Sequence, residues 1–317
     1  MVPMALNPPG PPTFDRPFPA LTPAQRYHFE LYGYTIVENT LDDGEVGRLK
    51  EALYRLRTSI QQLPQRGPEG PRSGGAYFLT DREHHHFMAN VLEADPEITA
   101  YATHPRLVSM AEEIMGSEAR ITEMNAHLNR REPGKNLDPE PKYGFHRGAD
   151  IPFFCHTHEG LFHCAFVKTL TNLTDLGPDD GGTVVVAGSH KVDLPAEQLV
   201  QVAYEDRSLI HQVVAPAGST LLFAETLIHA TGEVRSARER AILITGYGPT
   251  LFPYWDDGQL SPSFSGRIPP QLRPLFQGRE HWTRGPRYRQ LTDPVDARDF
   301  SLGAWDERLA APPTGGG

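Results

Sequence analysis

Short apolar segments separated by turn residues run through the middle of this chain, and they limit what it can fold into. Between Ala119 and Pro249, segments rich in Val, Ile, Leu and Thr alternate with turns rich in Gly, Pro and Asp. No helix long enough to connect parallel strands is expected between them. These features predict a fold that is mainly β with added helices, built as a jelly-roll barrel. The expected strands are Arg120–Asn129, Phe162–Thr171, Gly182–Ala187, His211–Ala215, Ser219–Ala224 and Arg240–Tyr247.

Helices are expected in the first third of the chain, where the apolar residues follow a different spacing. Residues 22–33 begin with a Thr N-cap and Pro at the first helical position, and they end at Gly. Residues 41–57 place apolar side chains three and four positions apart, which is typical of a helix that packs one face on a core. Residues 92–116 are expected to be helical with breaks at Pro96 and Pro105. We expect these N-terminal helices to brace the barrel.

The domain organisation is predicted from these patterns and from the Pro- and Gly-rich ends of the chain. One domain is expected, with a disordered arm before it and a flexible tail after it. The predicted divisions are residues 1–20 for the arm, 21–300 for the domain and 301–317 for the tail. Within the domain they are 21–117 for the helical brace, 118–250 for the barrel core and 251–300 for a C-terminal extension.

The composition excludes several classes of function. A formal net charge of −10 argues against binding to nucleic acid or to an anionic membrane, since both favour clustered Lys and Arg. The chain has no apolar run long enough to cross a bilayer, and its start lacks the pattern of a signal peptide. Cys155 and Cys164 are too few to staple a domain of this size, so both are expected to be reduced. We expect a cytoplasmic monomer or homodimer that acts on a small molecule.

Two histidines are candidate metal ligands. His146 lies within Gly144–Asp150 and His229 lies within Thr226–Thr231, each among apolar residues. A non-haem iron centre for oxygen chemistry needs two neutral imidazoles and one carboxylate, with open positions for a co-substrate and for oxygen. His146 lies at the end of a loop that enters the β-rich region and His229 follows an apolar strand, so both are placed to project into the mouth of the barrel. We therefore expect them to hold one ferrous ion.

Five segments occur in a characteristic order along the chain. They are Phe145–Gly148, Phe166–Asp175, Gly177–Gly182, Ala187–Lys191 and Leu227–His229. Together they resemble the phytanoyl-CoA dioxygenase family of iron(II)- and 2-oxoglutarate-dependent oxygenases, and the likeness extends from about Pro23 to about Pro249. The resemblance implies a double-stranded β-helix, which is a jelly-roll or cupin-like barrel. It also implies Fe(II) as cofactor, with 2-oxoglutarate and O2 as co-substrates.

The resemblance also implies roles for single residues. Arg240 occupies the place of the arginine that pairs with the distal carboxylate of 2-oxoglutarate, a role that suits a guanidinium fork. Arg240 is preferred to Arg238 because it directly precedes the apolar strand. Thr231 is placed to add a hydroxyl to the same carboxylate. Lys168 is interpreted either as a contact to 2-oxoglutarate or substrate, or as half of a buried ion pair.

Other histidines receive structural interpretations. The run His84–His86 is expected to form a polar exposed turn, because adjacent side chains point in different directions and cannot share one ion. In the family that the chain resembles, the Gly-Ser-His-Lys motif that contains His190 is structural and ties a loop across the barrel.

The chain departs from the family at the third iron ligand. Most members have Asp or Glu two residues after the first histidine, whereas this chain has Gly148 there and its nearest acid is Asp150. Asp150 reaches the iron if the loop bulges, which Gly148 permits. Alternatively, Glu159 supplies the carboxylate, or water or halide fills the place. Another alternative is a third nitrogen ligand from His156 or His158, although contact of such a histidine with substrate is preferred.

The predicted activity is hydroxylation of an unactivated carbon of a small organic substrate, lipid-like or a secondary metabolite, with release of succinate and CO2. His146, Asp150 and His229 are the predicted catalytic and metal-binding residues, and Arg240, Thr231 and Lys168 are the predicted co-substrate contacts. An iron-dependent halogenase that uses the gap at Gly148 is the first alternative. A non-catalytic barrel that binds a metal or ligand is the second.

Overall fold

The computed structural model describes residues 20–149, 154–254 and 260–280 of the chain. The strands within these ranges form three antiparallel sheets. The largest sheet has the order β1 (Tyr34–Val37), β10 (Thr220–Ala224), β7 (Val167–Asn172), β12 (Arg240–Pro249), β4 (Ala119–Asn129), β3 (His85–Ala89) and β2 (Tyr77–Arg82). The second sheet has the order β11 (His229–Ala230), β8 (Val184–Val186) and β9 (Ile210–Gln212), and the third pairs β5 (Cys155–His158) with β6 (Leu161–Cys164).

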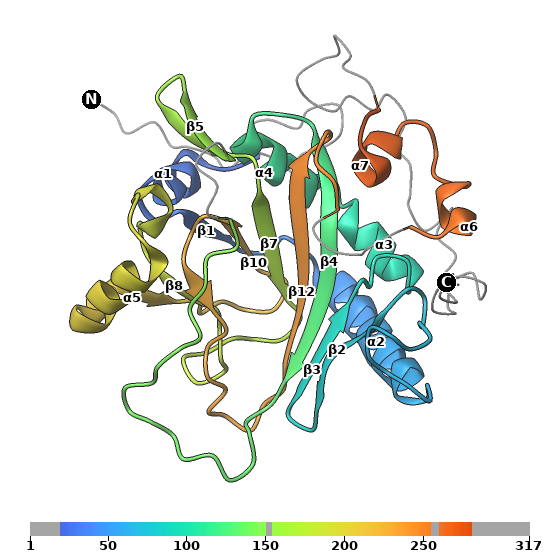
Figure 1. Cartoon of the computed structure of the whole chain (residues 1–317), viewed down its shortest axis with the longest axis horizontal. Helices are drawn as coiled ribbons and strands as arrows, with labels where there is room; N and C mark the ends of the chain where they lie inside the picture. Colours follow the sequence, from blue (N-terminus) through green and yellow to red (C-terminus); the bar gives the residue numbers. More distant parts are fainter. Residues whose placement is uncertain (1–19, 150–153, 255–259, 281–317) are drawn as a thin grey trace, which may run out of the picture.

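Helices cover one face of the seven-stranded sheet. In Figure 1, the long strands β4 and β12 run through the centre of the molecule, with β8 and α5 on one side and α2 and α3 on the other. The helices are α1 (Pro23–Tyr32), α2 (Asp43–Gln61), α3 (Pro96–Ala102), α4 (Pro105–Met115), α5 (Ala196–Glu205), α6 (Pro262–Ser265) and α7 (Arg273–Gln277), with short 3-10 helices at Ser189–Lys191 and Arg207–Leu209. Apolar side chains from α1 to α4 and from α6 and α7 join the outward side chains of β4 and β12 in one core.

The helix ends follow from the sequence signals that predict them. Thr22 caps α1, and its hydroxyl accepts a hydrogen bond from the Gln25 backbone while the Gln25 side chain accepts one from the Thr22 backbone. Gly33 ends α1 in the left-handed conformation, with φ of 81°. Gly116 ends α4 in the same way, with φ of 66°. The helical segment predicted over 92–116 is therefore two helices, α3 and α4, each with Pro in its first turn.

A second core lies between the seven-stranded and three-stranded sheets. It contains Leu170 and Leu221 from the first sheet, Val185 from the second, and Leu227 from the segment before β11. The two sheets are not joined into one closed hydrogen-bonded ring in the described part of the chain. The predicted barrel is thus an open pair of antiparallel sheets with helices packed on its outer side.

Each of the six predicted strands overlaps a strand of the structure, although several boundaries differ. The segment predicted over Phe162–Thr171 divides into β6 and β7, because the chain turns between Cys164 and Val167. The hairpin of β2 and β3 was not predicted, and His85 and His86 lie in β3 while His84 lies in its turn. The prediction of an exposed turn over His84–His86 is therefore wrong for two of the three residues. The strand places alternate side chains on opposite faces, so His85 reaches His127 and His86 reaches Asp81.

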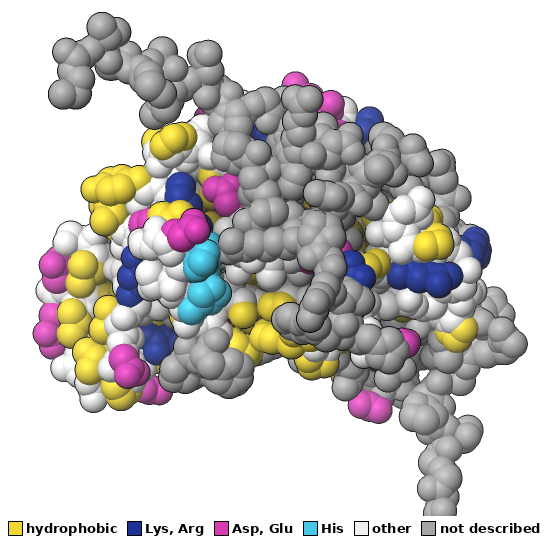
Figure 2. Space-filling model, turned by 90° about the horizontal axis from the view of Figure 1, so that it is seen from above, with side chains coloured by type: hydrophobic (Ala, Val, Ile, Leu, Met, Phe, Trp, Pro, Cys, Tyr) yellow, Lys and Arg dark blue, Asp and Glu magenta, His cyan; other side chains and the backbone are white. Residues whose placement is uncertain are grey.

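Charged and apolar side chains mix over the surface that the described residues present in Figure 2. No helix in the described ranges is long and apolar enough to span a membrane. The predicted arm over residues 1–20, apart from Ala20, and the predicted tail over 301–317 lie outside the described residues, as does Asp150. The cytoplasmic location and the oligomeric state stay predictions.

Candidate active site

The backbone brings His146 and His229 together. The His146 N–H donates to the carbonyl of His229 over 3.0 Å, and the His229 N–H donates to the carbonyl of His146 over 2.9 Å. The two imidazole ring centroids lie 4.3 Å apart. His229 also packs edge-on against Phe223 of β10, with 4.7 Å between ring centroids. The segment that carries His146 is thereby joined to β11, and the two predicted metal ligands lie side by side.

A backbone carbonyl lies within hydrogen-bonding distance of one nitrogen of each imidazole. Nδ1 of His229 lies 2.8 Å from the carbonyl oxygen of Leu227, and Nδ1 of His146 lies 3.3 Å from that of Gly144. When Nδ1 donates its proton to these carbonyls, Nε2 of both rings is left as the acceptor, the tautomer that binds a metal. Burial, with a smaller contribution from His146, lowers the pKa of His229 to about 3. His229 is therefore neutral over the physiological range.

The inward face of the large sheet carries polar side chains beside its apolar ones. Strand register places Arg240 opposite Asn129, and it places Ile242 between His127 on β4 and Asn172 on β7. Because side chains alternate along a strand, these inward positions share one face. The other face carries Leu243 and Tyr247, which belong to the core beneath the helices.

Arg240 is buried in this face with an incomplete set of partners. Its side chain is 2% exposed, and Nη2 donates to Thr183 Oγ1 over 3.2 Å. Nε and Nη1 are buried without a hydrogen-bond partner. Burial lowers its pKa to about 10, which still leaves the guanidinium charged at neutral pH. A buried guanidinium with unsatisfied donors fits the carboxylate of a small anion that the protein binds.

The neighbouring arginine differs in each of these respects. Arg238 has a side chain that is 61% exposed, and its guanidinium pairs with the carboxylate of Asp180. Of these two arginines, Arg240 is therefore the buried one with free donors, and its contact with an anion stays a prediction. Thr231, which is also predicted to contact 2-oxoglutarate, lies at an exposed position two residues after His229.

Lys168 lies in a buried ion pair with two carboxylates. Its Nζ is 2.9 Å from Glu123 Oε1 and 2.9 Å from Glu225 Oε1. Gly246 of β12 lies opposite both Lys168 and Glu123, and its lack of a side chain leaves room for the Glu123 side chain, whose Cγ would lie 2.7 Å from a Cβ at that position. The predicted ion pair is thus confirmed, and the contact of Lys168 with a co-substrate stays a prediction.

The charges in this cluster influence one another strongly. Burial alone would lower the pKa of Lys168, but the carboxylates of Glu225 and Glu123 outweigh it and hold that pKa above its usual range. Burial raises the pKa of Glu225 to about 7, although the Lys168 ammonium opposes the rise. The cluster is therefore one cation shared by two buried acids.

In the described residues, the two predicted metal ligands, His146 and His229, have no third candidate ligand beside them. No group of three His, Cys, Asp or Glu side chains is close enough to hold a metal in residues 20–149, 154–254 and 260–280. Asp150 lies outside these ranges. Glu159 lies on the turn between β5 and β6, with a side chain that is 81% exposed and 3.5 Å from His158. His156 stacks on His163 across the same hairpin.

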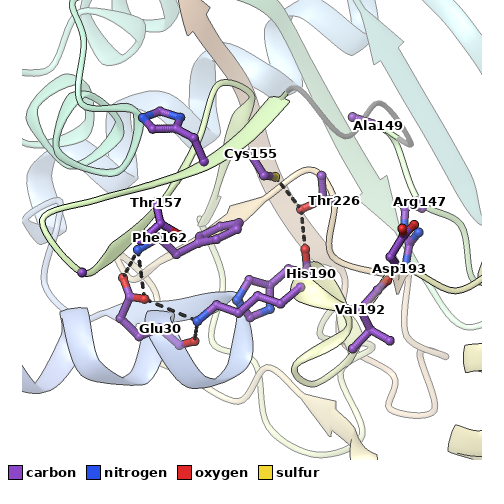
Figure 3. Close-up of a pocket in the computed structure, with 13 residues that line it drawn as sticks. Glu30, Arg147, Ala149, Cys155, Thr157, Phe162, His190, Val192, Asp193 and Thr226 are labelled. Carbon is purple, nitrogen blue, oxygen red and sulfur yellow. Dashed lines mark hydrogen bonds and ion pairs between the residues drawn. The ribbon is translucent and has the colours of Figure 1, made fainter.

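A cavity of about 480 Å³ lies beside the histidine segments. Ala149 and Thr226 line it on the side of the site, and His156 and Lys191 are among the polar residues of its wall. Figure 3 shows its labelled lining, including Arg147, Cys155 and Phe162, around one hollow. Its volume and mixed lining suit a medium-sized organic molecule with polar groups.

The Gly-Ser-His-Lys motif joins this wall to the segment before β11. The Ser189 hydroxyl accepts a hydrogen bond from the Ile228 N–H over 2.9 Å, and Thr226 Oγ1 donates to the carbonyl of His190 over 3.3 Å. The His190 ring is buried against Phe162. These contacts support the structural interpretation of the motif.

Cys155 and Cys164 face each other in the register of β5 and β6, and both are free thiols. The reduced state of both thiols stays a prediction. A contact with Cys164 lowers the pKa of Cys155 to about 7, and the same contact, together with burial, raises that of Cys164.

The comparison with known proteins decides the family. A family model described as phytanoyl-CoA dioxygenase (PhyH) matches residues 29–242, which is more than half of the chain. The chain belongs to the phytanoyl-CoA dioxygenase family. The resemblance stated from the sequence motifs is therefore confirmed, and so is the expectation that the protein is an oxygenase.

Two named relatives are distantly similar to this chain. Dioxygenase cdmD of Talaromyces verruculosus is 28% identical over 240 residues, which cover 71% of this chain and 73% of that protein. The human peroxisomal phytanoyl-CoA dioxygenase is 22% identical over 231 residues, covering 67% of this chain and 64% of the human protein.

Solved structures confirm the cupin-like fold. HygX from Streptomyces hygroscopicus, solved with nickel and 2-oxoglutarate bound, superposes with a TM-score of 0.55 and 23% identity. The match covers 74% of this chain and 90% of HygX. That similarity extends to the arrangement of strands and helices and leaves the residues of the site to be argued from this chain.

Sequence reasoning missed Glu225 and Glu123. Glu225 interrupts the apolar run Thr220–Ile228, and all nine of these residues are buried. An acidic residue inside a buried apolar run is itself a signal, because burial of an unpaired carboxylate is unfavourable. Lys168, the partner of both acids, lies far from them in the sequence. The ion pair therefore follows only from the pairing of the strands.

Proposed function

We propose that this chain is an Fe(II)- and 2-oxoglutarate-dependent dioxygenase that hydroxylates an unactivated carbon of a small organic substrate, with release of succinate and CO2. The observation that carries the proposal is the buried guanidinium of Arg240, whose Nε and Nη1 have no partner. Arg240 begins β12 of the large sheet, and His229 packs against Phe223 of β10 in that sheet. An unpaired buried cation of this kind is costly unless an anion binds it.

The residues present fit both absent groups. His146 and His229 offer two Nε2 atoms to one metal, and Arg240 offers two N–H groups to the distal carboxylate of 2-oxoglutarate. Thr231 is proposed to add its hydroxyl to that carboxylate. When bound, iron with 2-oxoglutarate and O2 supplies the oxidising chemistry that converts a C–H bond into an alcohol.

The chain's own part is to bind, orient and exclude water. The neutral form of His229 is the form that ligates, and burial maintains it. The apolar residues between the sheets, such as Leu221 and Val185, line one side of this region and keep it dry. The cavity beside Ala149 and Thr226 is proposed to receive the organic substrate, since it reaches the segments that carry both histidines.

An anaerobic titration tests the proposal. Fe(II) and 2-oxoglutarate together are expected to give a visible metal-to-ligand absorption band in the wild-type protein. His229→Ala is expected to abolish the band. Arg240→Ala is expected to keep the band at saturating 2-oxoglutarate but to raise the Kd at least about tenfold, because charge-assisted hydrogen bonds are lost. The absence of the band in a protein loaded with Fe(II) would refute the proposal.

The matched control is Arg238→Ala. Arg238 is two positions from Arg240 and has the same charge, but it is exposed and paired with Asp180. Its removal is expected to leave the Kd for 2-oxoglutarate within about threefold of wild type. Equal effects of the two substitutions would contradict the assignment of Arg240. Substrate-dependent succinate formation with an oxygenated product would establish the hydroxylase activity.

A further inference from the structure

The space that a side chain at position 148 would fill is occupied by Glu225. A Cβ built on Gly148 would lie 1.7 Å from Glu225 Oε1, 2.4 Å from its Cδ and 2.7 Å from its Cγ. These three atoms are the nearest neighbours of that Cβ, and all belong to one carboxylate side chain. The residue at position 148 is the one that carries the acid in most of the family, so a carboxylate is present in this space although the sequence has glycine there.

Backbone pairing holds this arrangement in place. The N–H groups of Gly148 and Ala149 both donate to the carbonyl of Glu225, over 3.2 and 3.3 Å. Further along the same two segments, His146 and His229 exchange their backbone hydrogen bonds. The two imidazoles and the Glu225 side chain therefore come from one pair of adjacent segments.

Glu225 has one oxygen engaged and one free. Oε1 lies 2.9 Å from the Lys168 ammonium, whereas Oε2 is buried without a hydrogen-bond partner. The residue is 1% exposed, so water does not satisfy that oxygen from the surface. A buried carboxylate oxygen without a donor is unfavourable, and a cation is the partner that would stabilise it most.

We infer that Glu225 supplies the carboxylate to the metal held by His146 and His229, in place of the acid that the family carries at position 148. This inference rests on the function proposed above. In the described residues, the side chains of His146, His229 and Glu225 are not close enough together to hold one metal ion. The inference therefore includes a rotation of the Glu225 side chain toward the two histidines. Lys168 would keep its contact with the first oxygen and hold the carboxylate toward the site.

The same geometry argues against a halide in the gap at Gly148. A chloride there would lie against the Glu225 carboxylate, and two adjacent anions in a buried site repel each other. The Lys168 charge does not favour the halide, because two carboxylates already share it.

Metal affinity tests the inference without reference to turnover. The probe is Co(II), added without oxygen and followed by calorimetry and by its visible spectrum, in wild type, Glu225→Gln and Glu123→Gln. Glu123→Gln is the matched control, because Glu123 contacts the same ammonium over the same 2.9 Å but does not border position 148. Glu225→Gln is expected to weaken Co(II) binding at least about tenfold more than the control and to change the Co(II) spectrum.

A carboxylate exchange provides a second arm. Gly148→Asp alone is expected to bind Co(II) poorly, since its Cβ collides with Glu225. The double variant Gly148→Asp/Glu225→Ala relieves the collision and returns a carboxylate to the site. We expect it to bind Co(II) at least about tenfold more tightly than Glu225→Ala alone. Thermal unfolding of each variant checks that it is folded.

Several outcomes would overturn the inference. Equal affinity and spectra for Glu225→Gln and Glu123→Gln would do so, and so would a loss confined to Asp150→Asn, which would make Asp150 the ligand. A chloride-dependent Co(II) spectrum in wild type would show a halide in the third place and would also overturn it. If His229→Ala abolishes Co(II) binding while Glu225→Gln leaves it unchanged, this inference fails and the proposed function stands. If wild type binds no Co(II), both fail.

Discussion

Replacement of Lys168 by Met removes the one cation shared by Glu123 and Glu225. Loss of one partner of a buried ion pair typically costs about 3–5 kcal/mol in the free energy of unfolding. Here the ammonium lies 2.9 Å from each of two carboxylates whose side chains are 5% and 1% exposed. We therefore expect a loss in the upper part of that range, about 4–5 kcal/mol. For a domain of this size, such a loss lowers Tm by about 8–20 °C.

The loss should also depend on pH. Burial already raises the pKa of Glu225 to about 7 in the folded protein, and removal of the ammonium raises it further. The folded variant then holds a proton that the unfolded chain has released, so its stability falls as the pH rises between the unfolded and folded pKa values. We expect the deficit relative to wild type to be larger at about pH 8 than at about pH 6.

Urea unfolding at the two pH values measures this deficit. Lys168→Met/Glu225→Gln is expected to recover at least about 2 kcal/mol, because it removes one of the two uncompensated charges. Lys135→Met is the exposed control: Lys135 lies 3.1 Å from Glu233 with a side chain that is 50% exposed, so its loss should cost less than about 1 kcal/mol. A deficit in Lys168→Met no larger than that of the control, or one that is the same at both pH values, would refute the reasoning.

Two further predictions concern the α2 helix and the β5–β6 hairpin. Gly47 lies in α2 with nothing within 4 Å of a built Cβ, so Gly47→Ala should stabilise the protein by about 0.5–1 kcal/mol. Gly33→Ala is the contrasting case, since its φ is 81° and its Cβ would lie 2.5 Å from the His190 ring; it should cost at least about 1 kcal/mol. Chemical denaturation of both variants checks the signs, and stabilisation by Gly33→Ala would contradict the geometry. Iodoacetamide should alkylate Cys155 faster than the buried Cys164, with the rate rising through about pH 7, and equal rates by mass spectrometry of the two peptides would contradict the pKa assignment.

Local signals predicted most of the framework. Thr22 and Gly33 mark the ends of α1 because caps and left-handed glycines act within a few residues, and the sequence shows them directly. The hairpin of β2 and β3 escaped prediction because its inward face mixes polar His85 with apolar Phe87. His85 there meets His127 of β4, a partner that only the sheet register supplies. Alternation of apolar and polar residues fails as a signal where the buried face itself includes polar residues.

The same distinction applies to the site. His146 and Arg240 could be found from motif order, because each lies beside recognisable neighbours in the sequence. Glu225 could not be connected with Gly148 in this way, because the two residues lie on different segments of the chain. Only in the folded structure does the Glu225 side chain occupy the space beside Gly148. A glycine in a sequence shows that a side chain is missing, and only the folded chain shows which other side chain fills its place.

The strand order has a consequence for when the proposed anion site can form. β12, which begins with Arg240, is the last strand of the large sheet to be synthesised, yet it lies between β7 and β4 and pairs with both. β1, the first strand in the sequence, pairs with β10, although most of the other strands of the sheet lie between them in the sequence. Pairings this distant in sequence make folding slow. A nascent chain that ends before Arg240 therefore has its sheet in two separate parts, and the site assembles only when the final strand enters between them.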